Sequence, residues 1–428
     1  MPRIRSPLAF ALPLTLVLPL ALTALAPAAG ATAPAPAPSP GGAAPPTVEE
    51  ARLDRAAPQE ILRRSGFDRS APEFGAALSR ARTFAEAERT ASGFGGRLWR
   101  KAVDRAQGRG PAGGDLSRSD DRPLYWARLT LTRELRGWQP GFGLTEEGRS
   151  RLLDRLERSS RGQDAIDYPA GKGMKRILLT GFDPFTLDRD TRIGNPSGAT
   201  ALALDGTVLR TADGSLARVE TAVFPVRWQD FADGTVERTL RPHLPEADLF
   251  TTVSQGRPGR FDVERTNGAW RGGFPDNANV SRTGTVPVAG DPARQPQWTS
   301  TTLPYAAITA AVTGRFPVYD NTSVTEVPAG ADAPVVRPDG PTPGSAARAG
   351  AGGDYLSNEI AYRATLLRDR LGLTGRLPGG HLHTPVLEFG PGNTDPTTGA
   401  VTDPAFVRNR LDIIAQVRAI LAVAAAER

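Results

Sequence analysis

The stretch Lys175-Arg176-Ile177-Leu178-Leu179-Thr180-Gly181-Phe182-Asp183-Pro184-Phe185 marks a change in the character of the chain. Its apolar run has the length and β-branched content of a buried strand, which Gly181 ends. The following turn carries two aromatic side chains. Such a strand predicts a layered α/β domain whose ligand site lies at the carboxyl ends of the strands, provided that strands and helices alternate after it.

Strands and helices do alternate in the sequence that follows. Apolar, β-branched runs predict strands at 219–226 and 249–253, and helical spacing predicts helices at 231–240, 305–312 and 358–371. Residues 320–353 are rich in Pro, Gly and Ala, which predicts a long structureless segment. Such a segment is either a lid over the site or a tolerated insertion.

The first 31 residues are typical of a secretory signal peptide. Arg3 and Arg5 precede a nearly continuous apolar run, and small residues follow it at Ala29-Gly30-Ala31. An uncleaved membrane anchor is the alternative, but Pro13 and Pro19 interrupt the run. We therefore expect a secreted or cell-envelope protein. Residues 32–47 form an Ala/Pro-rich linker with no core of its own.

Residues 48–170 are predicted to be helical. Apolar side chains recur at helical spacing in several segments separated by Gly, Pro and Asp: 51–62, 74–84, 98–103, 125–135 and 152–156. Trp99, Trp126 and Trp138 are expected in the core of this region, with peptide binding as the less favoured alternative.

Composition excludes several classes of function. The net charge of +6 comes from dispersed arginines with no dense basic run, so a nucleic-acid interface is not supported. The chain of 428 residues has no cysteine and three histidines, so we expect no metal site, and no motif indicates a cofactor.

Candidate catalytic residues gather late in the α/β segment. Ser357 follows two glycines and begins an amphipathic helix, where free N–H groups favour a developing negative charge. The same position suits an ordinary N-cap serine. A serine nucleophile needs a base and a group that orients the base. His381 and His383 alternate on a strand and share one face, and Glu264 and Asp276 are candidate carboxylates.

Residues 175–387 resemble the pyroglutamyl peptidase I (pyrrolidone-carboxylate peptidase) family. Its G-F-x-P-F pattern is matched by Gly181 to Phe185, and its Asn-Pro pair by Asn195-Pro196. Further short matches occur in the same order: Val253-Ser254-Gln255-Gly256-Arg257, Glu264-Arg265, Pro275-Asp276-Asn277, Thr302-Leu303-Pro304, Asp354-Tyr355-Leu356-Ser357-Asn358 and Leu382-His383-Thr384-Pro385.

This resemblance implies a three-layer α/β/α sandwich with a mainly parallel mixed sheet over residues 171–428, preceded by the all-α region. It also implies roles for single residues. The family's Cys–His–Glu triad falls on Ser357, His383 and Glu264, with Asp276 as a carboxylate behind the triad. Side chains implied to bind a pyrrolidone ring are Phe182, Phe185, Gln255 and Phe274.

Two departures from the family bear on activity. Serine stands where the family has cysteine, and a serine hydroxyl must lose its proton during attack. Gly273 stands where the family has an arginine. The leading hypothesis is a hydrolase that removes N-terminal pyroglutamate, or a related group, through an acyl-enzyme. The alternative is a non-catalytic relative that binds modified peptide N-termini. Either form is a possible homo-oligomer.

Overall fold

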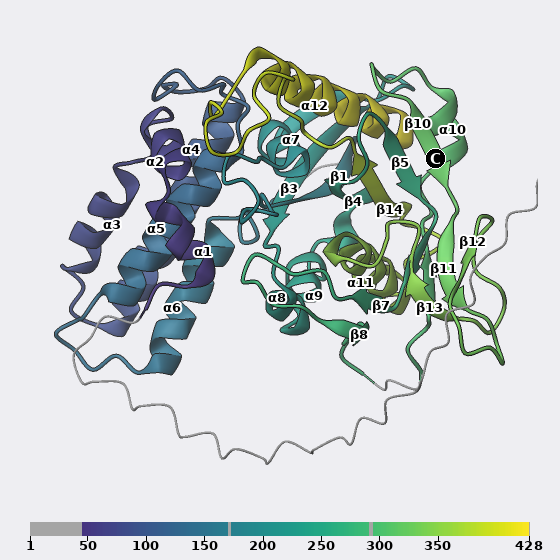
Figure 1. The fold of residues 1–428 in the computed structure, drawn as a ribbon, viewed down its shortest axis with the longest axis horizontal. Coiled ribbons are helices and arrows are strands. Elements are labelled where there is room, and N and C mark those ends of the chain that lie inside the picture. The colour runs from purple at the N-terminus through teal and green to yellow at the C-terminus, as the bar shows by residue number, and fades with distance from the viewer. Residues whose placement is uncertain (1–44, 170–172, 291–293, 428) are drawn as a thin grey trace, which may run out of the picture. The chain divides into compact units, whose positions relative to one another are not determined.

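The computed structural model describes residues 45–169, 173–290 and 294–427 (Figure 1). Its main sheet contains seven strands: β1 (Met174–Phe182), β2 (Thr207–Arg210), β3 (Leu216–Phe224), β4 (Leu249–Gln255), β5 (Phe261–Glu264), β10 (Val318–Asn321) and β14 (Gly379–Thr384). They lie in the order β10-β5-β14-β4-β1-β3-β2. Neighbours are parallel except β2 with β3 and β5 with β14, so the sheet is mixed and mainly parallel.

Helices cover both faces of this sheet (Figure 1). One face carries α7 (Pro196–Leu204), α10 (Tyr305–Ala310) and α12 (Pro404–Ala424), and the other carries α8 (Trp228–Ala232), α9 (Thr235–Leu240) and α11 (Leu356–Arg370). A short 3-10 turn, Leu244–Glu246, precedes β4. Side chains of β1 alternate between the two cores: Ile177 packs in the core that contains Ile413 of α12, and Leu178 in the core that contains Ile360 of α11. The predicted α/β/α sandwich is thereby confirmed.

The region before the sheet is all-helical, as predicted. Its elements are α1 (Val48–Ala51), a 3-10 turn (Arg52–Asp54), α2 (Ala56–Arg63), α3 (Ser70–Leu78), α4 (Phe84–Ala106), α5 (Arg122–Gly137) and α6 (Glu146–Ser159). Trp99 and Trp126 are buried, and Trp138 packs half-buried against the same cluster. That cluster also contains Ile177 of β1, so one hydrophobic core joins the helices to the sheet.

Two expectations about the α/β part are wrong. Residues 320–353 are not structureless, because they contain the end of β10 and a three-stranded antiparallel sheet of β11 (Val324–Val327), β12 (Val335–Arg337) and β13 (Ala346–Ala349). The helix expected at 231–240 is two short helices, because Gly234 adopts a left-handed conformation with φ of 76°. Two further ribbons pair β6 (Thr266–Gly268) with β9 (Trp298–Ser300), and β7 (Trp270–Gly272) with β8 (Thr283–Thr285).

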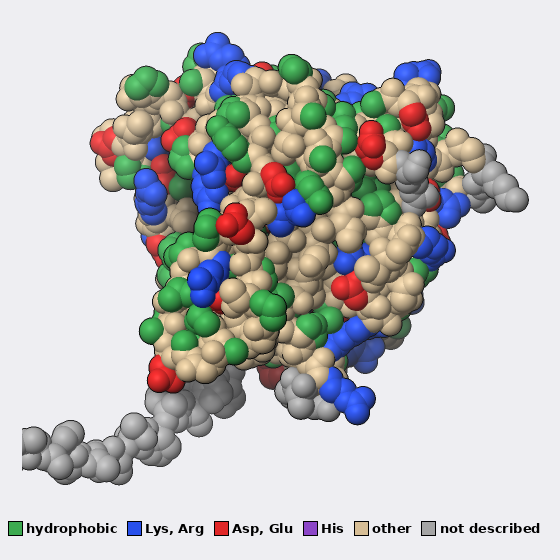
Figure 2. All heavy atoms as spheres, turned by 90° about the vertical axis from the view of Figure 1, so that its right-hand side faces the viewer, with side chains coloured by type: hydrophobic (Ala, Val, Ile, Leu, Met, Phe, Trp, Pro, Cys, Tyr) green, Lys and Arg blue, Asp and Glu red, His purple; other side chains and the backbone are tan. Residues whose placement is uncertain are grey.

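The predicted signal peptide and nearly all of the linker lie outside the described residues. Within the described ranges, no helix is both long enough and apolar enough to cross a membrane. On the side of the molecule shown in Figure 2, acidic and basic side chains are interspersed and do not gather into a single-sign patch.

Candidate active site

His383 and Glu264 form a buried pair on the neighbouring strands β14 and β5. Nδ1 of His383 lies 2.6 Å from Oε1 of Glu264. The second carboxylate oxygen, Oε2, accepts a hydrogen bond of 2.7 Å from Nδ2 of Asn321, which also donates to the carbonyl of Ala351 at 2.8 Å. A carboxylate at Nδ1 keeps the proton of a neutral imidazole on that nitrogen, so Nε2 is left as an acceptor.

Ser357 is the second residue of α11 and does not cap it. The N-cap is Tyr355, in an extended conformation, and among the described residues the helix has no side-chain cap hydrogen bond. The interpretation of Ser357 as an N-cap serine is therefore wrong. Its Oγ donates to the carbonyl oxygen of Gly352 at 3.2 Å. Among the described residues, no hydrogen bond joins Ser357 to His383.

Gly352 lies between the serine and the histidine. A Cβ placed on Gly352 would lie 3.1 Å from Cε1 of His383, while its carbonyl accepts the Ser357 hydroxyl. Gly256 also packs against this residue, because a Cβ there would come within 2.6 Å of the His383 Cβ. A Cβ at Gly256 would force His383 to shift, and one at Gly352 would press on the edge of its ring, so both close approaches limit where the imidazole can lie.

The amino terminus of α11 offers hydrogen-bond donors next to Ser357. The first backbone N–H groups of a helix have no partner within the helix, and in the part of the chain that the structure describes no capping side chain replaces one. The positive end of the helix dipole lies at the same place. An oxygen that gains negative charge beside Ser357 would be stabilised there.

A small pocket opens beside Ser357. It is lined by Phe182, Phe185, Asn195, Val226, Ser254, Gln255, Tyr355, Leu356 and Ser357, and its volume is about 30 Å³. That volume accommodates roughly two water molecules.

The residues expected to bind the ring lie in different places. Phe182 is buried and stacks on Phe231 with ring centroids 6.1 Å apart, whereas Phe185 is half-buried and faces Tyr355 at 6.2 Å. Gln255 ends β4 at the pocket, and its Oε1 accepts a bond of 3.3 Å from the Leu387 backbone. Phe274 lies outside the lining, 49% exposed, and packs edge-on against Tyr355.

Asp276 organises a loop and does not contact the His383–Glu264 pair. Its Oδ2 accepts a bond of 2.8 Å from the Trp228 backbone, and its Oδ1 accepts from the backbones of Ala278 and Val280, both at 2.9 Å. Trp228 in turn packs edge-on against Tyr355. Asp276 therefore supports the aromatic wall of the pocket. The expectation that it lies behind the triad is wrong.

Gly273 stands where the resembled family has an arginine, and the arginine nearest to it in this sequence is Arg271. Its guanidinium binds Glu359 of α11 through two bonds of 2.6 Å and lies over the Trp228 ring at 5.1 Å. This cation is therefore already paired within the protein and fixes α11 against the aromatic wall.

Two residues of the site, Asn195 and Asn321, were not among the predicted site residues. Asn195 lines the pocket and donates to the Asp183 carbonyl at 2.9 Å, which holds the aromatic turn after β1. Asn321 orients Glu264 from a segment expected to be structureless. Its only signal was the run Val318-Tyr319-Asp320-Asn321, which is too short to predict a strand.

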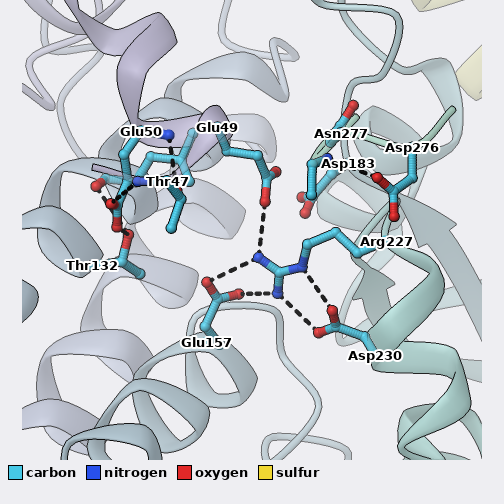
Figure 3. Close-up of polar contacts among 12 residues, drawn as sticks. Thr47, Glu49, Glu50, Thr132, Glu157, Asp183, Arg227, Asp230, Asp276 and Asn277 are labelled. Carbon is cyan, nitrogen blue, oxygen red and sulfur yellow. Dashed lines mark hydrogen bonds and ion pairs between the residues drawn. The ribbon is translucent and has the colours of Figure 1, made fainter. Parts of the chain in front are cut away.

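The helical region holds the loops that carry the pocket residues. Figure 3 shows Arg227, directly before Trp228, in contact with Glu49, Glu157 and Asp230 at 2.9, 3.1 and 2.7 Å. Arg52 binds Asp188, on the loop that follows Phe185, at 2.8 Å. It also donates to the carbonyl of Asn277.

The candidate site is built from a hydroxyl, an oriented imidazole, helix N–H groups and an aromatic pocket. In the described part of the chain, no group of three or more His, Asp or Glu side chains is placed to hold a metal ion. The chemistry that these protein groups can support is nucleophilic attack on an acyl carbon.

Fold and site together define an α/β sandwich protein with a buried His–Glu pair beside a serine-bearing helix. Two family models match the chain: the PA0049 N-terminal domain over residues 30–157, and the PA0049 C-terminal domain over residues 176–288 and 315–388. The uncharacterized protein PA0049 of Pseudomonas aeruginosa is 34% identical, and the match covers 88% of each chain. The chain belongs to the PA0049 family.

Solved structures of peptidases resemble part of the chain. Pyroglutamyl peptidase I of Bacillus amyloliquefaciens matches 59% of this chain and 98% of its own, with 19% identity and a TM-score of 0.40. A mutant pyrrolidone carboxyl peptidase from the hyperthermophile Pyrococcus furiosus matches 59% and 99%, with 22% identity and a TM-score of 0.39. Likeness at this level does not assign an activity to this chain.

Proposed function

We propose that this protein is a hydrolase that removes N-terminal pyroglutamate, or a closely related cyclic acyl group, from peptides or small amides. The observation that carries the proposal is the buried His383–Glu264 pair, with Asn321 on the second carboxylate oxygen. A protein that only binds a ligand has no need of an imidazole oriented in this way. The aromatic pocket beside Ser357 suits a flat, uncharged ring.

The proposed reaction begins with Ser357. Its Oγ attacks the acyl carbon while its proton passes to Nε2 of His383, and the N–H groups of α11 stabilise the oxyanion. The C–N bond then breaks, and the leaving amine takes the proton from Nε2. Water attacks the acyl-enzyme and gives a proton to Nε2, which returns it to Oγ as the ester bond breaks.

Attack requires the Ser357 hydroxyl to leave the Gly352 carbonyl and turn to His383. Both residues contact Gly352, so a change in one side-chain torsion is the motion proposed. Catalytic hydrogen bonds of this kind are often long in a free enzyme and shorten when substrate is bound.

A second candidate function is binding without cleavage. The observation that favours it is the present hydrogen bond of Ser357, which goes to Gly352 and not to a base. In this function the same pocket would hold a modified peptide N-terminus. In either case the expected signal peptide would bring the protein to substrates outside the cytoplasm.

The test uses a pyroglutamyl chromogenic amide with the wild type, Ser357→Ala and Ser357→Cys. We expect turnover by the wild type and its loss in the alanine variant. A silent wild type with an active cysteine variant would establish the binding function, because the pocket and base would then be intact. No turnover by any of the three, with no binding of pyroglutamyl amide by calorimetry, would overturn both candidates.

A further inference from the structure

A second contact between a serine and a histidine lies in the pocket. Oγ of Ser254 is 2.9 Å from Nε2 of His381, and Oγ1 of Thr252 is 2.7 Å from Nδ1 of the same ring. Ser254 and Thr252 belong to β4, which pairs in parallel with β14, the strand that carries His381. Ser254 also lines the pocket, so the residue that contacts the buried histidine also borders the ligand space.

His381 is completely buried, and it is neutral. Burial lowers its pKa well below the usual range, and the neighbouring His383 lowers it further. The rings of the two histidines meet edge to face with centroids 4.7 Å apart. A neutral imidazole carries one N–H, so one of its nitrogens donates and the other accepts.

We assign the proton of this ring to Nδ1 from the hydrogen bonds of Thr252, because hydrogen positions follow from the hydrogen-bond network. Its hydroxyl donates to the carbonyl oxygen of Gly380 at 3.3 Å, so its oxygen is free to accept from Nδ1 of His381. Nε2 is then without a proton and must accept. Within the described ranges, the hydrogen that reaches it is that of Ser254, whose hydroxyl therefore points into the protein.

We infer that Ser254 presents lone pairs and no hydrogen to the pocket, and so recognises an N–H group of the ligand. Its neighbour Gln255 is complementary, because its Oε1 accepts from the Leu387 backbone and, within the described ranges, its NH₂ has no hydrogen-bond acceptor and remains for a carbonyl. An acceptor beside a donor matches the adjacent N–H and C=O of a lactam. The inference rests on the proposed function and adds the basis of ring selectivity.

Ser254 is a specificity residue here and not the nucleophile. His381 has no carboxylate partner among the described residues, and its contacts are the hydroxyls of Thr252 and Ser254 and the edge of His383. Without a carboxylate, the imidazolium formed by proton transfer would have no stabilising charge in a fully buried position.

The test measures binding in the full chain that carries Ser357→Ala, so that turnover does not enter. The probes are pyroglutamyl amide and its lactone analogue, in which a ring oxygen replaces the N–H, and the readout is the ratio of their dissociation constants by calorimetry. We expect the lactam to bind at least about tenfold tighter, because the ring oxygen of the lactone has no hydrogen to donate to the hydroxyl oxygen of Ser254. Adding Ser254→Ala is expected to bring the ratio close to one.

Two controls separate the possible outcomes. Adding Ser92→Ala, on α4 and outside the pocket lining, is expected to leave the ratio unchanged. If Ser254→Ala keeps the full preference for the lactam, the inference is overturned while the proposed function stands. If neither probe binds, the proposed function fails and the inference fails with it. Acylation of Ser254 in the wild type, detected by mass spectrometry, would also overturn the acceptor role.

Discussion

Arg227 and Glu49 form an ion pair in which Nη1 lies 2.9 Å from Oε2, and this pair connects α1 to the turn before Trp228. The same guanidinium also contacts Glu157 of α6 and Asp230 of α8, as Figure 3 shows. These ion pairs thus connect the helical region to the α/β region. Because Trp228 packs against Tyr355, the pair also reaches the wall of the candidate pocket.

Replacing Arg227 with Met is predicted to destabilise the protein by about 3–5 kcal/mol, because three mostly buried carboxylates lose their shared cation. Urea unfolding of wild type and variant measures the difference. The matched control is Arg238→Met, whose partner Asp154 is 3.4 Å away with both side chains largely exposed. That change is expected to cost less than about 1 kcal/mol. Equal effects of the two variants would contradict a structural role specific to Arg227.

Glu264→Gln is predicted to lower kcat by roughly 10³–10⁴-fold with little change in KM, because the imidazole loses the carboxylate that holds its tautomer. Asn321→Ala is expected to lower kcat by about ten- to a hundredfold, since Glu264 keeps its charge and loses one hydrogen bond. Steady-state kinetics on a pyroglutamyl amide provides both values.

The control for these two variants is Asn409→Ala, a change on α12 at the residue that binds Arg315. It is expected to leave kcat and KM unchanged. An Asn321→Ala enzyme as active as the wild type would mean that the hydrogen bond to Oε2 does not position Glu264 for catalysis.

Sequence patterns were sufficient for the elements whose signal is local. The run at Ile177 predicted β1 because consecutive apolar or β-branched residues favour a buried strand, but the expected end at Gly181 is wrong, since the strand continues to Phe182. The alternation of His381 and His383 correctly placed both rings on one face of β14. The helix around Ser357 was also predicted close to its observed start at Leu356, but it is not amphipathic as expected, because polar and apolar positions alike are buried up to Arg368.

Features that depend on long-range contacts were not predictable in this way. Asn321 reaches Glu264 across 57 positions of sequence, and its strand forms only because β5 provides the partner edge. Phe274 was expected to bind the ring because of the resemblance. It lies outside the pocket lining and packs against Tyr355, and sequence periodicity does not indicate this contact. The place of Asp276 behind the triad was implied by the resemblance, whereas its three hydrogen bonds from backbone N–H groups identify a loop-organising role.

Gly352→Ala is predicted to reduce activity by at least about tenfold while changing stability little. The new methyl group would lie 3.1 Å from Cε1 of His383, so the ring or the 350–354 segment must shift by a few tenths of an ångström. Misplacement on this scale is costly in catalysis because nucleophile and base must be aligned. Gly375→Ala is the matched control, since no atom lies within 4 Å of its added Cβ. Unchanged kinetics in Gly352→Ala would contradict the proposed approach of Ser357 to His383 past this glycine.

Asp121 is predicted to make stability fall as pH rises. Its Oδ2 accepts from the backbone of Asn195 at 2.8 Å, and burial raises its pKa, with the charge of Asp120 adding to the effect and Arg410 and Arg122 opposing it. In the unfolded chain the carboxyl ionises near its ordinary value of 3.8. Between that pH and the raised pKa the folded protein holds the extra proton, so the free energy of unfolding declines with increasing pH.

Asp121→Asn removes this titration and keeps an oxygen for the Asn195 amide. The variant should therefore gain stability relative to the wild type on going from about pH 4.5 to about pH 7.5, measured by urea unfolding at both values. Asp188→Asn is the control of opposite sign. The hydrogen bond from Arg52 lowers the pKa of Asp188 to about 2, so its contribution is complete above about pH 4 and is lost only in stronger acid. The stability difference between Asp188→Asn and wild type should thus stay constant over the same interval. If the difference for Asp121→Asn is constant as well, the raised pKa of Asp121 is refuted.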